Sequence, residues 1–177
     1  MPHRDIGPFD MGLEKADPEI AMALGVIFGE FGFGELTIVK ICALLIGEHN
    51  PETPISHQIM GTIQSISLRL EILVGCAEKS PHIEGRRQLV RDAIAELRSI
   101  NALRNLYVHA AYGTHHETGE LFRETWFSST TRNGEQEPVT ASGIRNDIEK
   151  IKLARGRIAR SLFPQDVETY QKPEASP

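Results

Sequence analysis

Apolar residues that recur with the period of an α-helix constrain the fold of this chain more than any other feature. The longest such stripe consists of Ile83, Val90, Ile94, Leu97, Ile100, Leu103 and Tyr107. Spacings of three, four and seven residues put these side chains on one face of a helix. The stripe predicts a long amphipathic helix that packs this face against other helices and ends at Gly113, a typical residue just beyond a helix.

The segment 17–46 predicts either one long helix or two shorter ones. Asp17 is a suitable N-cap, and Pro18 is suited to the first helical position. The glycine cluster at positions 29, 32 and 34 is the natural place for a break. A second helix would then run from Gly34 to Ile46 and be apolar on nearly all sides, as central helices are.

Two further helices are predicted later in the chain. One begins at Thr53 or Ser56 and ends near Lys79, with an inward stripe made of Ile59, Ile63, Ile66, Leu70, Leu73 and Val74. The last helix is capped by Ser142 and stops before Pro164, with an inward stripe made of Ile144, Ile148, Ile151, Ile158 and Leu162.

Between the last two helices the pattern changes from helical to extended. Residues 120–141 hold β-branched and aromatic residues around "RNGE", Arg132 to Glu135, and Asn-Gly is a strong signal for a hairpin turn. We expect two strands, at about 120–129 and 136–141. The predicted fold is therefore all-α, an antiparallel bundle of four to five helices with a small β-hairpin before the last helix.

Length and composition predict one domain in an ordinary globular chain. The chain has 177 residues, of which 40% are hydrophobic and 24% are charged. The bundle is expected over residues 18–163, between a loose N-terminal segment, 1–17, and a loose C-terminal tail, 164–177. Cys42 and Cys76 lie in apolar helical patterns without a C-x-x-C pair, which favours two reduced, buried thiols in a cytoplasmic protein. The most apolar run, residues 36–47, is too short to span a bilayer, so no membrane association is expected.

Charge is unevenly distributed along the chain. The net charge is −5, which argues against a general nucleic-acid binder. Residues 1–80 carry five Lys and Arg against eleven Asp and Glu, whereas residues 145–163 carry six against two. The last helix thus has a basic face that either contacts phosphates or is simply solvated.

The stretch "LRNLYVHAAYG", residues 103–113, places polar side chains at the end of the longest stripe. Arg104 falls on the apolar stripe itself, where a guanidinium needs a partner or a wet cleft. Asn105 and His109 are four residues apart and share a helix face. Arg104 and His109 are five apart, about 140° around an ideal helix. They border one groove only if the helix loosens before "AYG" or a second subunit completes the groove.

A structural explanation for these residues stays open beside the functional one. Arg104 would then pair with an acid of a neighbouring helix, such as Glu30 or Glu35, and His109 would cap the helix end. Neither role requires a substrate.

The hexapeptide "RNLYVH" resembles the R-x-x-x-x-H motif of the HEPN superfamily (higher eukaryotes and prokaryotes nucleotide-binding domain). In that family a polar residue, often Asn, follows the Arg, and the motif lies near the end of a long helix in an all-α bundle. Arg104, Asn105 and His109 match these three elements. The architectural likeness extends over residues 18–163.

The resemblance implies metal-independent RNA cleavage at a homodimer interface, with no cofactor. Arg104 and His109 would be catalytic and Asn105 auxiliary, and Tyr107 and Tyr112 would stack on a base, although core packing is the alternative for Tyr107. The residue types suit this chemistry, because imidazole takes or gives a proton near neutral pH and a guanidinium holds phosphate oxygens. The family also implies toxin or antiphage roles and a possible antitoxin or regulatory partner.

Three other features of the sequence indicate neither a catalytic nor a binding site. "THHETGE" places His115, His116 and Glu117 together, but adjacent histidines on a loop do not close a metal site, so a solvated turn is expected. "GEFGFGEL" lacks the preceding strand and the spacing of a phosphate loop. Neither cysteine has a supporting histidine motif. The alternatives to a ribonuclease are a non-catalytic module that binds a nucleotide or protein, and a structural dimerising bundle.

Overall fold

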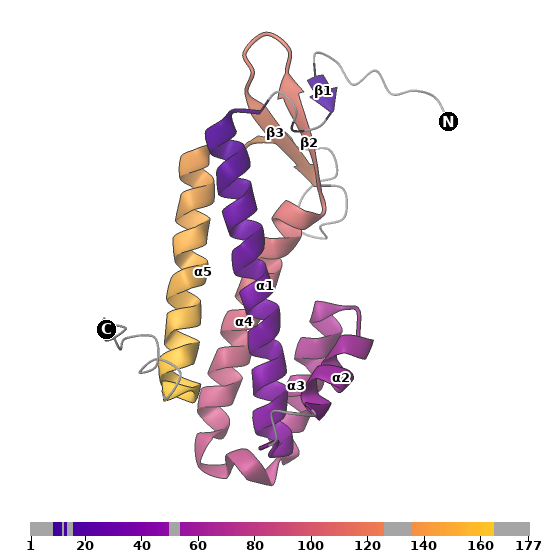
Figure 1. Cartoon of the computed structure of the whole chain (residues 1–177), viewed down its shortest axis with the longest axis vertical. Coiled ribbons are helices and arrows are strands. Elements are labelled where there is room, and N and C mark those ends of the chain that lie inside the picture. The colour runs from indigo at the N-terminus through magenta and orange to yellow at the C-terminus, as the bar shows by residue number, and fades with distance from the viewer. Residues whose placement is uncertain (1–8, 12, 14–15, 50–53, 126–135, 165–177) are drawn as a thin grey trace, which may run out of the picture. The chain divides into compact units, whose positions relative to one another are not determined.

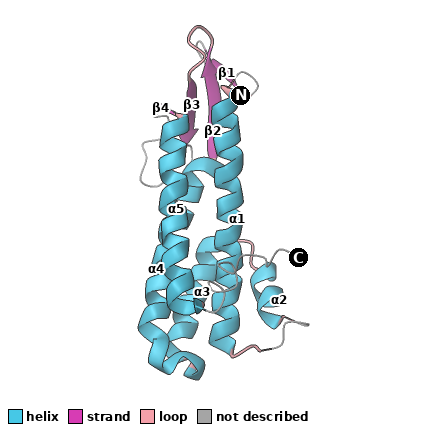
Figure 2. Ribbon diagram, turned by 60° about the vertical axis from the view of Figure 1, so that its left-hand side comes forward, coloured by secondary structure: helices cyan, strands magenta, loops and turns pink. Residues whose placement is uncertain are grey.

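The computed structural model describes residues 9–11, 13, 16–49, 54–125 and 136–164. Most of these residues are helical, and Figures 1 and 2 show the helices and a small sheet. The helices, including one 3-10 helix η1, are α1 (Pro18–Ile46), α2 (Ile55–Thr62), α3 (Ile66–Lys79), η1 (Pro81–Arg86), α4 (Arg87–Val108) and α5 (Ala141–Leu162). The strands are β1 (Phe9–Met11), β2 (Ala110–His115), β3 (Leu121–Thr125) and β4 (Gln136–Pro138). The predicted helical bundle with a small hairpin before the last helix is confirmed.

The chain divides into two compact units, whereas the sequence predicted one domain over 18–163. Unit 1 comprises residues 1–29 and 102–149, and unit 2 comprises residues 30–101 and 150–177. The helices α1, α4 and α5 each contribute residues to both units. Each unit is described separately below.

Unit 1 contains the antiparallel sheet, with strand order β1-β2-β3-β4. The predicted pairing around the "RNGE" turn is present as β3 and β4, in which Arg123 lies opposite Glu137. The turn itself lies outside the described residues. Two strands were not predicted. One is β1, which falls within the N-terminal segment expected to be loose, and the other is β2, which pairs with both β1 and β3.

Buried side chains from all three helices and from the sheet form the core of unit 1. They include Leu24, Ile27, Tyr107, Leu121, Val139, Ile144 and Ile148. Asp17 caps the start of α1 as predicted, because its Oδ1 accepts a hydrogen bond from Glu19 N at 2.7 Å. At the start of α5, however, the cap is Thr140 and not Ser142, since Thr140 Oγ1 accepts from Gly143 N at 3.1 Å.

In unit 2, α1 and α3 run in the same direction. Arg69 pairs with Glu35 at 3.3 Å, and Ser80, just beyond α3, donates to Leu45 O at 2.6 Å. The single helix predicted from residue 53 or 56 to Lys79 is interrupted between α2 and α3, where Ser65 caps α3 by accepting from Leu68 N. The short α2 therefore precedes an independent α3, and that part of the prediction is wrong.

The helix α4 runs antiparallel to both α3 and α5 in unit 2. Ser67–Asn101 and Glu78–Arg91 connect α4 with α3, and Glu96–Arg157 connects it with α5. Arg86, the last residue of η1 just before α4, donates to Leu162 O at the end of α5. Many buried side chains of unit 2 belong to the predicted stripes, among them Leu70, Leu73, Ile83, Val90, Ile94, Leu97, Ile151 and Ile158. The amphipathic patterns identified the core-facing sides of α4 and α5, whereas in the stripe predicted to end near Lys79 only Leu70 and Leu73 are buried and Ile59 is exposed.

The first helix continues through the glycine cluster without a break and reaches 29 residues. It is long and apolar enough to cross a membrane by length and composition, with a mean hydropathy of 1.5 over its most apolar window, of which a third is buried. The long helix of a water-soluble bundle passes the same test, so these two properties do not assign α1 to a membrane.

The two cysteines are free and differ in exposure. Cys42 is buried, and burial raises the pKa of its thiol to about 11. Cys76 is exposed, so the prediction that both thiols are buried is wrong for Cys76. A thiol with a raised pKa is a poor nucleophile at neutral pH.

Candidate functional site

The residues of "RNLYVH" lie at the carboxyl end of α4, in unit 1. Arg104 is half-buried, and Asn105 and His109 are exposed. The helix ends at Val108, five residues before the predicted stop at Gly113, so His109 is the first residue beyond it. Gly113 lies in β2, opposite Phe122 of β3. The predicted stop is therefore wrong, and His109 occupies the junction between a helix and a strand.

Two hydrogen bonds define this junction. His109 N still donates to Asn105 O at 3.3 Å, as in a helical turn. The hydroxyl of Tyr112 donates to Tyr107 O at 2.9 Å and so satisfies one of the last carbonyl oxygens of α4. These hydrogen bonds hold residues 107–112 against the end of α4, and His109 lies within this segment.

Tyr107 is a core residue, 3% exposed, and its hydroxyl donates to Asp147 Oδ2 of α5 at 2.8 Å. Burial, the hydrogen bond to Asp147 and the charge of Asp147 together raise the pKa of Tyr107 well above its ordinary value. A buried ring is not open to a nucleobase. The base-stacking role predicted for Tyr107 does not fit this position, and the core-packing alternative does.

Arg123 of β3 adds a second guanidinium close to the junction. It lies over the Tyr107 ring, 4.9 Å from the ring centroid, and pairs with Glu137 of β4 at 2.9 Å. Sequence reasoning missed Arg123 and Asp147. The available signal was indirect: a tyrosine on an apolar stripe needs a hydrogen-bond partner for its hydroxyl.

Tyr112 is half-buried in β2, and burial raises its pKa to about 12. Its hydroxyl donates a hydrogen bond to Tyr107 O, and this bond holds the side chain against the end of α4. The structure therefore brings Tyr107 and Tyr112 together as a structural pair. Whether the ring of Tyr112 also meets a base stays a prediction of the sequence.

The acids considered as partners for Arg104 belong to unit 2. There Glu30 pairs with Arg155, and Glu35 pairs with Arg69. Both glutamates thus take part in ion pairs with arginines of other helices.

The histidines of "THHETGE" lie at the turn that joins β2 to β3. His115 Nδ1 accepts hydrogen bonds from Glu117 N and Thr118 N, both at 3.3 Å, and Gly119 closes the turn with a φ of +71°. The expected solvated turn is confirmed. Among the described residues, no group of three or more His, Cys, Asp and Glu side chains is placed to hold a metal ion.

Comparison with known proteins returned no match: neither a protein-family model, nor a curated protein, nor a solved structure is similar to this chain.

Proposed function

We propose that the protein is a metal-independent endoribonuclease of HEPN type that acts as a homodimer. One observation supports this most directly. The helix α4 ends at Val108, and the chain leaves the helical spiral directly after His109, whose N–H still donates to Asn105 O at 3.3 Å. This is the loosening before "AYG" on which a shared groove depends.

In the proposed reaction the 2′-hydroxyl of RNA attacks the adjacent phosphorus, and the bond from phosphorus to the 5′-oxygen breaks. One proton leaves the 2′-oxygen and another reaches the departing 5′-oxygen, which yields a 2′,3′-cyclic phosphate and a 5′-hydroxyl. His109 is exposed and suited to either transfer. Arg104 would hold the phosphate oxygens as negative charge gathers on them, and Asn105 would orient the imidazole or the phosphate.

The exposure of Asn105 and His109 also supports a site completed by a second copy of the chain. An exposed helix end offers only one wall to a bound RNA, and an isologous dimer places the same end of two chains face to face. A toxin or antiphage role, with an antitoxin or regulatory protein as partner in the cytoplasm, is part of the same proposal.

The test is cleavage of single-stranded RNA in the presence of EDTA. We expect Arg104→Ala and His109→Ala each to slow cleavage by about a hundredfold or more, because general acid–base catalysis contributes about 10²–10⁴ and a group that stabilises transition-state charge about 10²–10³. Matched controls are Arg98→Ala, an exposed arginine earlier on α4, and His116→Ala, an exposed histidine of the β2–β3 turn. Both controls should cleave like the parent chain.

Sedimentation or light scattering on the same samples reports the oligomeric state. A dimer that leaves RNA intact would contradict the catalytic proposal and favour the non-catalytic binding module. A dimer that neither cleaves nor binds a nucleotide or RNA would favour the structural bundle. Cleavage that persists in both alanine variants would remove Arg104 and His109 from the mechanism.

A further inference from the structure

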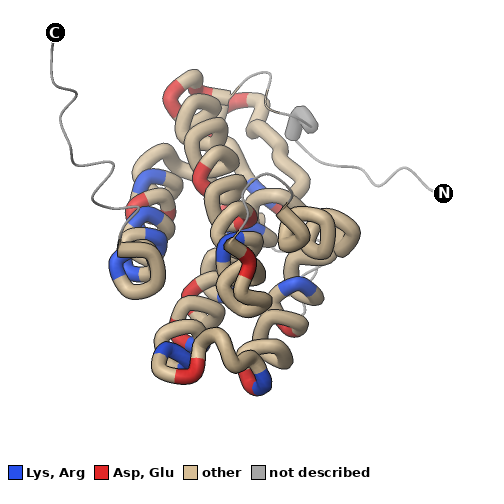
Figure 3. The backbone as a smooth tube through the Cα atoms, turned by 60° about the horizontal axis from the view of Figure 1, so that its bottom comes forward, with Lys and Arg blue, Asp and Glu red and all other residues tan. Residues whose placement is uncertain are grey.

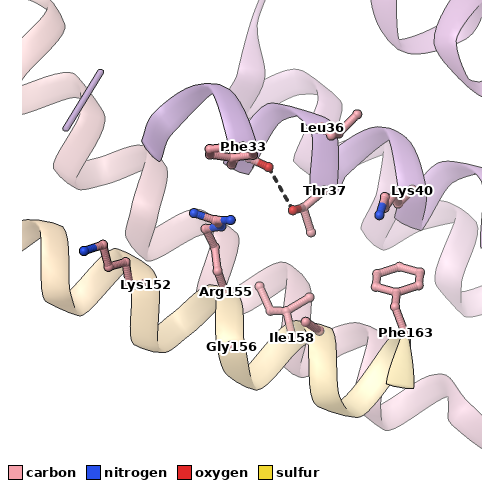
Figure 4. A pocket seen from close by; sticks show the side chains of 10 residues that line it. Phe33, Leu36, Thr37, Lys40, Lys152, Arg155, Gly156, Ile158 and Phe163 are labelled. Atoms are coloured by element: carbon pink, nitrogen blue, oxygen red, sulfur yellow. Dashed lines mark hydrogen bonds between the residues drawn. The ribbon is translucent and has the colours of Figure 1, made fainter. Parts of the chain in front are cut away.

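A groove of about 360 Å³ lies between α1 and α5 in unit 2, away from the residues of "RNLYVH" in the sequence. Figure 4 shows its two walls, one from each helix. The helices run in the same direction here, because Glu30 pairs with Arg155 while Lys40 lies over the ring of Phe163, 5.8 Å from its centroid. The groove therefore follows the two helices for about two turns.

Apolar side chains line both walls of the groove. Phe33 and Leu36 line it from α1, while Ile158 and Ala159 of α5, with Phe163 just beyond that helix, line the other side. Phe33 is 51% exposed and Leu36 is 43% exposed, which are high values for large apolar side chains. An apolar ligand in the groove would remove this surface from water.

The charged groups of the groove are all cationic among its described lining residues: Lys40, Lys152 and Arg155. Lys40 and Lys152 are exposed, and Arg155 pairs with Glu30 while it lies over the Phe33 ring, 4.3 Å from the centroid. A cation therefore sits over the aromatic ring at each end, as Figure 4 shows.

The surroundings add positive charge to the groove. The guanidinium of Arg160 lies beside Gly156, where a Cβ would be 3.3 Å from Arg160 Nη1. The helix α5 as a whole carries six Lys and Arg against two acidic residues (Figure 3) in a chain whose net charge is −5. Three of the six, Arg145, Arg155 and Arg157, pair with glutamates of other helices, so the positive charge near the groove comes mainly from the lysines and Arg160.

The polar side chains that line the groove indicate which kind of anion it can bind. Thr37 is the one described lining residue with a hydroxyl, and it already donates to Phe33 O at 2.9 Å. The described lining side chains include no amide or carboxylate that would read the edge of a nucleobase. The volume lies at the lower end of the range for small-molecule sites, about 300–1,000 Å³. Apolar walls with cations at the rim suit a ligand that has an apolar chain and a single anionic head group.

We propose that this groove binds a small amphiphilic anion, an apolar chain that ends in a carboxylate, sulfate or phosphate. The apolar chain would lie along Phe33, Leu36 and Ile158. Its head group would be held by Lys152 at the rim, where a charge-assisted hydrogen bond is stronger than a neutral one. The binding site is independent of the proposed ribonuclease site, which lies in unit 1.

Calorimetric titration of the full chain with decanoate, below the concentration at which it forms micelles, tests the proposal. We expect one decanoate per chain, no binding of acetate, and no binding of decyltrimethylammonium, which has the same chain and the opposite charge. Lys152→Ala should weaken decanoate binding about tenfold, because it removes a charge-assisted hydrogen bond to the head group. The matched control is Lys150→Ala, an exposed lysine of α5 that does not line the groove.

A second variant, Ala159→Trp, fills the groove and should abolish binding while circular dichroism shows that the chain is folded. Equal binding of the cationic amphiphile, equal losses in Lys150→Ala and Lys152→Ala, or no decanoate binding by the folded parent chain would overturn the proposal. Sedimentation with phosphatidylglycerol vesicles distinguishes a lipid bilayer as the source of the same chemistry. Vesicle binding without decanoate binding would mean that the groove recognises a membrane surface and not a single amphiphile.

Discussion

The hydroxyl of Tyr107 connects the end of α4 to α5, and its removal gives the sharpest test of how unit 1 is held together. The donor lies 2.8 Å from Asp147 Oδ2, on a side chain that is 3% exposed. Tyr107→Phe keeps the ring and its contact with Arg123 but deletes this donor. A hydrogen bond to a charged group is worth about 1.5–3 kcal/mol, so we expect the free energy of unfolding at pH 7 to fall by about 2 kcal/mol.

Urea denaturation followed by circular dichroism measures this loss. With a slope of about 1–3 kcal/mol per molar urea, the midpoint should move down by about 1 M. The variant Asp147→Asn and the double variant complete a cycle that isolates the pair. If the two single losses simply add, or if Tyr107→Phe costs less than about 0.5 kcal/mol, the hydrogen bond does not hold the two helices together.

The alkaline pH dependence provides an independent check with a defined sign. The pKa of Tyr107 is higher in the folded chain than its ordinary value near 10, so the folded chain retains a proton that the unfolded chain releases. The stability that this shift provides is fully present below pH 10 and is lost as the pH rises further, at up to about 1.4 kcal/mol per pH unit. The variant Tyr107→Phe has no hydroxyl to titrate at this position. The difference in free energy of unfolding between the parent chain and Tyr107→Phe should therefore shrink above pH 10. A deficit that stays constant from pH 9 to pH 11 would refute the reasoning.

Three further changes have expected outcomes in the same unfolding assay. Ser80→Ala should lower the free energy of unfolding by about 2 kcal/mol, because Ser80 is 7% exposed and its hydroxyl both donates to Leu45 O and accepts from His82 N. The control Ser99→Ala, at an exposed serine of α4, should change it by less than about 0.5 kcal/mol. Gly47→Ala should lower the free energy of unfolding by about 1–2 kcal/mol, because φ is +67° and a Cβ would lie 2.6 Å from the His82 ring. Gly25→Ala should instead raise it by about 0.5–1 kcal/mol, because a Cβ at Gly25 of α1 would have no atom within 4 Å. Tyr112→Phe should cost about 1 kcal/mol at pH 7, and since the folded pKa of Tyr112 is about 12, this deficit should shrink between pH 10 and pH 12; a deficit that persists unchanged at pH 12 would contradict the role given to the hydroxyl.

The helices were predictable because burial follows their apolar period closely. All five residues of the stripe predicted for the last helix, from Ile144 to Leu162, are buried in α5. Local capping chemistry fixed the start of α1, where Asp17 and Pro18 act as expected. Where two capping residues compete within a few positions, as Thr140 and Ser142 do, the choice depends on backbone geometry that the sequence does not contain.

The sheet was only partly predictable because its strands form through pairing and not through local preference. Residues 110–115 begin with two alanines, which favour a helix, yet they form β2 because β1 and β3 provide partners on both sides. Of these partners, β3 follows β2 directly through a turn, whereas β1 lies about a hundred residues earlier in the sequence. The glycines of α1 show the opposite effect: the cost of each glycine in a helix, about 1 kcal/mol, is offset by packing of residues such as Ile27, Phe31 and Ile38 along the same helix.

The unpredicted strand β2 changes how the motif of Arg104 and His109 is understood. If α4 continued to Gly113, the helical spiral would direct the two side chains about 140° apart, and a groove between them would require a second subunit. Because β2 pairs with its neighbours and Tyr112 satisfies Tyr107 O, the helix ends at Val108, and the position of His109 is set by the junction. We therefore expect the orientation of the imidazole to depend on the Tyr112 hydroxyl and on the β2–β3 pairing, since both fix the chain on the far side of His109. In the proposed enzyme, Tyr112→Phe should accordingly lower the rate of RNA cleavage more than the affinity for RNA. If Tyr112 instead stacks on a base, Tyr112→Phe should leave both the rate and the affinity nearly unchanged, since phenylalanine stacks as well as tyrosine, and only Tyr112→Ala should lower the affinity.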